Sequence, residues 1–240
     1  MFPISPTAYD VNFRFLGFPI RIHPFFWVMV FIFFMQVPVD TLIFWLCRYA
    51  VWCSALFVSV LVHELGHAFV FRYVFSVESE IILHGLGGLT IPHRSHRRSY
   101  GVQGTLLEIL LNIAGCLAGF ILAAIAFVLF INVGSGYGIG TFNPMNLLRE
   151  FLFITLFVCI IWGVVNLLPI YPLDGGHISR EIFLFFSPRN GLKFSLVLSL
   201  ITAIICAIAC LNFQLYFVAI FCGFWAYQNF IDLQQRSFRF

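Results

Sequence analysis

Charged residues are scarce in this 240-residue chain: only 10% are Asp, Glu, Lys or Arg, whereas 61% are hydrophobic. A soluble domain carries about 25% charged residues, so the composition excludes an ordinary water-soluble protein and indicates an integral membrane protein. The chain also lacks internal repeats, low-complexity segments and any polar stretch long enough for a second domain. We therefore expect residues 1–240 to form a single membrane-embedded domain.

Paired cysteines of the CxxC type are absent as well. The seven cysteines all lie in apolar stretches, which predicts small buried hydrophobic residues rather than disulfides or a thiolate metal site. The N-terminus lacks a short basic region followed by an apolar core and a cleavage site, so we expect no removable signal peptide. The net charge of +3 is weak, and we expect no nucleic-acid partner.

What the chain does have is a series of long apolar runs, and spanning a bilayer takes about 20 such residues. The six candidate spans are Pro24–Val37, Trp45–Tyr73, Thr105–Asn132, Leu147–Leu168, Leu192–Leu211 and Phe213–Ile231. The first is short and ends before Pro38, and the last two meet at Asn212, which predicts a tight helical hairpin. The expected fold class is an all-α polytopic membrane protein with about six transmembrane helices.

The positions of the basic residues agree with this count. With six spans and a cytoplasmic N-terminus, one side of the membrane receives 11 of the 13 Lys and Arg residues. These are Arg14, Arg21, Arg72, Arg94, Arg97, Arg98, Arg180, Arg189, Lys193, Arg236 and Arg239. The other side receives only Arg48 and Arg149. By the positive-inside rule, we expect a multi-pass protein of the cell membrane with both termini in the cytoplasm.

Two segments lack the pattern of a spanning helix. Residues 11–24, VNFRFLGFPIRIHP, alternate in character and contain Gly17 and Pro19, which predicts a strand or hairpin. Residues 77–92, VESEIILHGLGGLTIP, are rich in β-branched residues and broken by glycines, which also predicts a hairpin. Because an open sheet edge cannot face lipid, we expect these small β elements to be buried in protein or near the cytoplasmic face.

The segment HELGH, residues 63–67, places polar groups inside an apolar run. On a helix, His63 and His67 share one face and are one turn apart, so both can reach one Zn²⁺ at about 2.0–2.1 Å. Glu64 is then close enough to take a proton from a zinc-activated water and to return it, without being a ligand. The alternative interpretation is that the histidines only form hydrogen bonds between helices.

A catalytic zinc site normally has three protein ligands, and NLLPIYPLDGGH, residues 166–177, offers Asp174 as the third. The predicted spans that lead to HELGH and to Asp174 run in the same direction, so both should end near the cytoplasmic side. Two prolines break the helix before Asp174, and Gly175 and Gly176 permit a sharp turn. Alternatively, Asp174 is only a helix-terminating turn residue.

Other polar residues have weaker assignments. Asn166 can donate a hydrogen bond to a substrate carbonyl or an oxyanion, although a hydrogen bond between helices explains it equally well. His93 and His96 flank a basic loop, where solvated side chains are expected rather than a second metal site. His23 is expected to be a hydrogen-bonding anchor at the membrane boundary. His177 either supports the metal site or packs beside it.

HELGH together with NLLPIYPLDGG resembles the site-2 protease family of intramembrane zinc metalloproteases. FPIRIHPFF, HGLGGLT and NIAGCLAGF extend the resemblance over most of the chain, although Cys116 and Gly119 replace the Pro and Asn that the family usually has in the last segment. The chain is similar to the compact, bacterial sporulation-factor-processing branch, which implies a bacterial source. Neither a PDZ nor a CBS domain is visible.

The resemblance implies one Zn²⁺ per chain, held by His63, His67 and Asp174, with Glu64 as the catalytic base. It also implies membrane protein substrates, cut in or near their transmembrane segments within the lipid bilayer. A regulatory membrane protein is a conceivable further partner that no sequence feature supports.

A substrate helix must unwind before it is cut, because its carbonyls are hydrogen-bonded within the helix. The hairpin that contains Gly87 and Gly88 can hold the unwound peptide by strand addition, unless the hairpin is purely structural.

Two rival interpretations remain open. A membrane metal-binding or transport protein would carry polar residues along several spans, whereas here they gather at one predicted depth. An inactive homologue that acts as a binding partner would be expected to lose Glu64 or a metal ligand, and all four residues are present.

Overall fold

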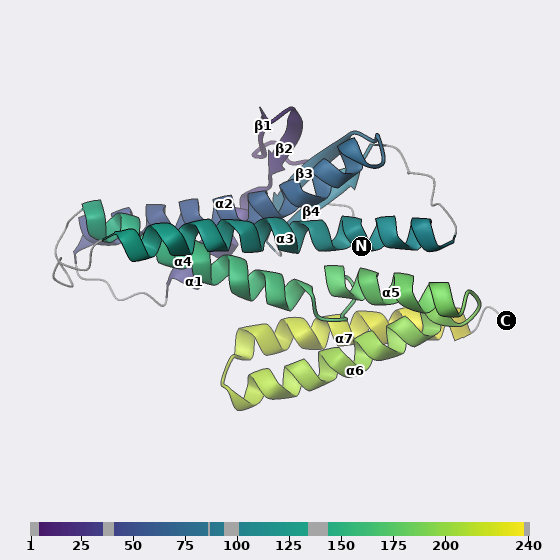
Figure 1. Ribbon diagram of the computed structural model, residues 1–240. Helices are drawn as coiled ribbons and strands as arrows, with labels where there is room; N and C mark the ends of the chain where they lie inside the picture. Colours follow the sequence, from purple (N-terminus) through teal and green to yellow (C-terminus); the bar gives the residue numbers. More distant parts are fainter. Residues whose placement is uncertain (1–4, 36–40, 86, 94–100, 134–143, 238–240) are drawn as a thin grey trace. The chain divides into compact units, whose positions relative to one another are not determined.

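The computed structural model describes residues 5–35, 41–85, 87–93, 101–133 and 144–237, and Figure 1 traces their secondary structure. This described part is mostly helical, with seven helices and one four-stranded sheet. The chain divides into two compact units: Met1–His96 with Ala114–Gly163, and Arg97–Ile113 with Val164–Phe240.

The sheet belongs to the first unit and has the strand order β1–β2–β3–β4. Its strands are β1 (Val11–Phe15), β2 (Phe18–Ile22), β3 (Ser79–His84) and β4 (Gly87–Pro92). The antiparallel pairs β1–β2 and β3–β4 confirm both predicted hairpins. Leu16 and Gly17 connect β1 to β2 with φ angles of 49° and 82°, the left-handed conformation that two-residue hairpin turns favour.

The pairing of β2 with β3 was not predicted. These two strands run parallel, with Ile20 opposite Ile81, and this pairing joins the two hairpins into one sheet (Figure 1). Helices α1 (Pro24–Phe34) and α2 (Leu42–Tyr73) pack against it. The shared core consists of Phe18, Ile20, Ile22, Phe26, Val30, Val60, Leu61, Leu65, Ala68, Ile81 and Leu83.

Two polar contacts anchor the ends of these helices. His23 is the N-cap of α1 and accepts a hydrogen bond from the amide of Phe25 at 3.2 Å, which agrees with the expected hydrogen-bonding role. Arg72, in the last turn of α2, donates to the carbonyl oxygens of Leu16 and Gly17 at 3.1 and 2.9 Å. The β1–β2 turn is therefore tied to the end of α2.

Four helices of the described chain are long and apolar enough to cross a membrane: α2, α3 (Val102–Asn132), α4 (Pro144–Asn166) and α6 (Gly191–Asn212). The prediction of a multi-pass protein is confirmed at this coarser level, but six spans were expected. Helix α1 has 11 residues, about 16 Å, whereas the hydrocarbon core is about 30 Å thick. Helix α7 (Tyr216–Ser237) has sufficient length, but Asn229 and Asp232 make its second half polar.

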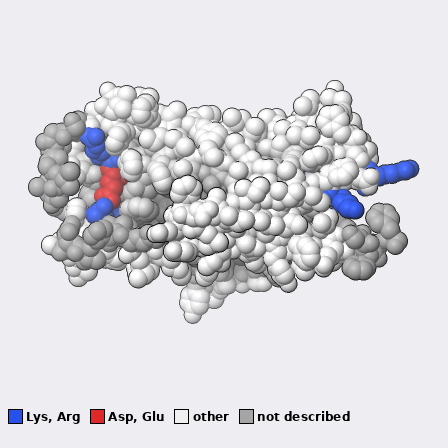
Figure 2. Space-filling view, turned by 90° about the horizontal axis from the view of Figure 1, so that it is seen from below, with Lys and Arg blue, Asp and Glu red and all other residues white. Residues whose placement is uncertain are grey.

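The surfaces of these helices suit lipid. Ile121 and Ile125 of α3 are 63% and 52% exposed, and Ile205 of α6 is 61% exposed. Exposed apolar surface of this kind is unfavourable in water and normal in a bilayer. On the face in Figure 2, the charged side chains form separate groups with uncharged surface between them. Several basic residues used to predict the orientation lie outside the described residues: Arg94, Arg97, Arg98 and Arg239.

In the second unit, α6 and α7 form the predicted helical hairpin, and α5 (Asp174–Phe186) packs against α6. The expected sharp turn at Gly175 and Gly176 was wrong, because both glycines lie in the first turn of α5. A Cβ on Gly175 would lie 2.1 Å from the carbonyl oxygen of Leu167, and one on Gly176 would lie 2.4 Å from the amide nitrogen of Tyr171. The glycines therefore allow α5 to begin directly against the preceding loop.

Candidate metal centre

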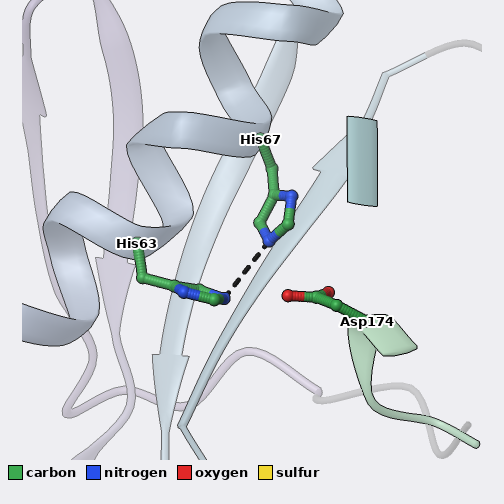
Figure 3. Close-up of side chains that lie close together, drawn as sticks. All are labelled: His63, His67 and Asp174. Carbon is green, nitrogen blue, oxygen red and sulfur yellow. Dashed lines mark hydrogen bonds between the residues drawn. The ribbon is translucent and has the colours of Figure 1, made fainter. Parts of the chain in front are cut away.

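His63 and His67 lie on the same face of α2, as their spacing predicted (Figure 3). Both side chains are buried, and their Nε2 atoms are 3.3 Å apart. Two zinc–nitrogen bonds of about 2.0–2.1 Å that meet at a tetrahedral angle place the nitrogens about 3.3–3.4 Å apart. The imidazole pair therefore already has the separation that one zinc ion requires.

Asp174, the first residue of α5, supplies the third ligand. One ligand atom from each of His63, His67 and Asp174 lies within 4.8 Å of the others, and Figure 3 shows the carboxylate facing the imidazoles. Two imidazole nitrogens and one carboxylate oxygen form a donor set of catalytic zinc sites, in which a fourth position stays open. The predicted convergence of these three side chains is confirmed, and Asp174 begins a helix rather than ending one.

Space for the imidazoles comes from glycines where α2 and α3 approach each other. A Cβ on Gly115 would lie 2.3 Å from Nε2 of His67 and 2.9 Å from Nε2 of His63. A Cβ on Gly66 would lie 2.4 Å from the carbonyl oxygen of Ala114. Any side chain at Gly115 would occupy the space next to the two Nε2 atoms. This free space, together with the donor set of two imidazoles and one carboxylate, fits a zinc ion.

Glu64 is buried beside strand β4. The hydroxyl of Thr90 lies 2.7 Å from Oε2 of Glu64 and 3.1 Å from its main-chain oxygen. A Cβ on Gly88 would lie 2.2 Å from Cγ and 2.5 Å from Oε1 of Glu64. Thr90 was not predicted from the sequence, because a single threonine in a strand has no spacing that relates it to a distant helix.

Gly87 and Gly88 both have packing reasons to be glycine. Gly87 has a φ of 119°, and a Cβ there would lie 2.6 Å from the indole ring of Trp162. Gly88 makes room for the side chain of Glu64. Strand β4 ends the strand order, so one of its edges is unpaired among the strands that the structure describes.

Two buried polar residues that were not predicted from the sequence hold the loop before Asp174. Ser199 of α6 accepts a hydrogen bond from the Tyr171 amide at 2.8 Å and donates to the Pro169 carbonyl at 3.1 Å. Asn229 of α7 donates to the Tyr171 carbonyl at 2.7 Å. Non-helical backbone inside a membrane protein needs such partners, because lipid offers none.

The remaining candidates differ in their surroundings. Asn166, the last residue of α4, is buried, and its side chain makes no hydrogen bond within the described part of the chain. His177 packs on Tyr171 with ring centroids 4.9 Å apart, which agrees with the packing alternative. His93 is exposed, and His96 lies outside the described residues.

Comparison with known proteins gives a family match over most of the chain. The model of peptidase family M50 matches residues 52–209, which include all three ligands. A zinc metalloprotease from Methanocaldococcus jannaschii is 29% identical over 175 residues, or 71% of this chain and 44% of that protein. The chain thus matches less than half the length of this relative.

A solved structure gives a fuller match. The site-2 protease from Methanocaldococcus jannaschii is 26% identical to this chain, with a TM-score of 0.56. The likeness covers 92% of this chain and 95% of that one, so it extends over both compact units.

Proposed function

Because the chain belongs to peptidase family M50, we propose that it is a zinc-dependent intramembrane endopeptidase that cuts membrane proteins in or near their transmembrane segments. The observation that carries this proposal is the meeting of His63, His67 and Asp174 at one point, with Glu64 next to the first ligand on α2. One Zn²⁺ per chain would polarise the scissile carbonyl and lower the pKa of the attacking water towards about 7.

Glu64 is the proposed general base and general acid. Its carboxylate takes a proton from the attacking water and then delivers it to the leaving amine. The burial of Glu64 supports this role, because a proton held there is shielded from bulk water. Asn166 is proposed to donate a hydrogen bond to the carbonyl oxygen as negative charge develops, and its buried amide, without a hydrogen bond in the described chain, supports that assignment.

Strand β4 is the proposed binding site for the unwound substrate. An extended peptide can add to the unpaired edge of a sheet through main-chain hydrogen bonds. The terminal position of β4 in the strand order and its contact with Glu64 through Gly88 support this proposal.

We also propose a topology of six spans with both termini in the cytoplasm of a bacterial cell. The distribution of Lys and Arg supports this topology. The two spans beyond the four long apolar helices are those expected at Pro24–Val37 and Phe213–Ile231. Residues 1–240 would act as one proteolytic domain, because the solved structure that resembles the chain matches 92% of it. The expected partners are membrane protein substrates and the lipid bilayer.

A single substitution tests the proposed activity. Glu64→Gln should lower the cleavage of a membrane-tethered reporter by at least about 10³-fold while zinc stays at one ion per chain, because the ligands are intact. Glu150→Gln is the matched control: it affects only an ion pair with Arg48 at a distance of 2.9 Å and should cleave at the wild-type rate. Wild-type cleavage by Glu64→Gln would refute the assigned role.

A further inference from the structure

The hydrogen bond between Thr90 and Glu64 links strand β4 to the proposed base. Thr90 Oγ1 lies 2.7 Å from Oε2 of the carboxylate and 3.1 Å from the main-chain oxygen of the same residue. A hydroxyl group has one hydrogen, and the shorter bond to a charged oxygen is the stronger of the two. Thr90 therefore donates to the carboxylate.

Thr90 is held more firmly than the group that it contacts. It pairs with Ile81 of β3, which is completely buried, and β3 is paired on its other side with β2. A β-branched side chain has few χ1 rotamers, whereas the last torsion of a glutamate is broad. The hydroxyl can therefore fix an orientation that the Glu64 side chain does not fix by itself.

The two oxygens of Glu64 have different surroundings on β4. Gly88 lies two residues before Thr90, on the same face of the strand. A Cβ on Gly88 would lie 2.5 Å from Oε1, so Oε1 occupies the space that a side chain would fill. Within the described residues, Oε1 accepts no hydrogen bond, whereas Oε2 accepts one from Thr90.

We propose that Thr90 is a positioning residue for hydrolysis: its hydroxyl holds Oε2 of Glu64 and leaves Oε1 to exchange the proton with the attacking water. This inference rests on the proposed function and deepens it, since it gives each carboxylate oxygen its own task. It also makes the β3–β4 hairpin a support for the reacting groups, in addition to its proposed role in holding substrate.

Two variants at this position separate the hydroxyl from the methyl group. Thr90→Val, which keeps the shape and removes the donor, should lower kcat for the tethered reporter by about 10- to 100-fold, the usual cost of losing a supporting partner. KM should stay within about twofold, and zinc should stay at one ion per chain, because the ligands are not touched. Thr90→Ser, which restores the donor, should recover kcat to within about threefold of wild type.

The control is Thr155→Val. Thr155 of α4 is 1% exposed, and its hydroxyl has no hydrogen-bond partner within the described residues. The same chemical change at this site should leave kcat within about twofold of wild type. Unchanged kcat in Thr90→Val would overturn the proposal. Equal losses in Thr90→Ser and Thr90→Val would also overturn it, because the methyl packing would then explain the effect.

A second measurement keeps this inference separate from the proposed function. If the wild-type chain held zinc but cleaved no reporter, the proposed function would fail. The hydrogen bond between Thr90 and Glu64 can still be tested in that case, from unfolding rates in dodecyl sulfate. Thr90→Val should accelerate unfolding about tenfold in the wild-type background and leave the rate unchanged in a Glu64→Ala background. Equal acceleration in both backgrounds would overturn the proposed contact.

Discussion

The imidazole ligands and the carboxylate ligand reach the metal centre by different means. His63 and His67 lie on one continuous helix, where a spacing of four residues is enough to align them. Asp174 follows a broken helix, and the backbone before it depends on hydrogen bonds from Ser199 and Asn229 on two other helices. The helical spacing alone therefore aligns His63 and His67. The position of Asp174, in contrast, depends on contacts between its loop and neighbouring helices.

The largest expected effect tests whether both halves of the site are required. His67→Ala and Asp174→Ala should each lower bound zinc from one ion per chain to below about 0.1, because a catalytic site needs three protein ligands. The measurement is the zinc content of purified, dialysed protein. His93→Ala, which removes an exposed histidine, should keep its zinc. Full zinc content in Asp174→Ala would mean that α2 binds the metal alone.

A smaller effect is expected from crowding the imidazole pair. Gly115→Ala should weaken zinc affinity by about 10- to 100-fold, because the new Cβ would lie 2.3 Å from Nε2 of His67. Competition with a chelator measures this affinity. Gly119→Ala is the control on the same helix, since its Cβ would meet only the Cys159 carbonyl at 3.9 Å. Equal zinc affinities for the two variants would mean that Gly115 is not needed to make space for the imidazoles.

Zinc binding by Asp174 should respond to substitutions in α6, because α6 holds the loop before this residue. Ser199→Ala removes the acceptor for the Tyr171 amide and should weaken zinc affinity by about tenfold, because the loop before Asp174 loses its hold. Ser195→Ala is the matched control: Ser195 is also buried but donates only within α6, to the Leu192 carbonyl at 3.3 Å. Unchanged zinc affinity in Ser199→Ala would mean that the carboxylate ligand does not depend on the neighbouring helix for its position.

The smallest expected effect concerns the sheet. Burial, together with the charge of His23, lowers the pKa of His84 from its ordinary value of 6.5 to about 4. The unfolded chain therefore binds a proton that the folded chain does not, and the free energy of unfolding should fall as the pH is lowered from 6.5 towards 4. The contribution is on the order of 1 kcal/mol after solvent screening. Unfolding measured across this range should show a smaller decline in His84→Gln, and identical declines would contradict the assignment.

Local patterns predicted much of this molecule. The HELGH spacing predicted the imidazole pair, the glycines of residues 77–92 predicted a hairpin, and Asn212 predicted the junction of α6 and α7. The prediction of Asp174 as a ligand combined a rare acid with the direction of two spans. In each case, the information lay within one segment or in the order of the segments.

The missed features depend on contacts between distant segments. Ile20 and Ile81 pair in parallel across a long stretch of chain, and neither strand alone specifies that partner. Gly175 and Gly176 were assigned to a turn because glycine permits turns, whereas the deciding factor is the closeness of a preceding loop. Thr90, Ser199 and Asn229 are single polar residues in apolar elements, and each acts through a neighbour that only the folded chain supplies.

The parallel pair of β2 and β3 has a practical consequence. Phe18 and Ile20 of β2 are almost fully buried, and β2 covers the side of β3 that faces away from β4. Deleting residues 1–22 to shorten the protein would uncover a row of main-chain donors and acceptors along Ile81 and Leu83. Such a bare strand readily recruits strands from other molecules, so the truncated protein should self-associate during purification.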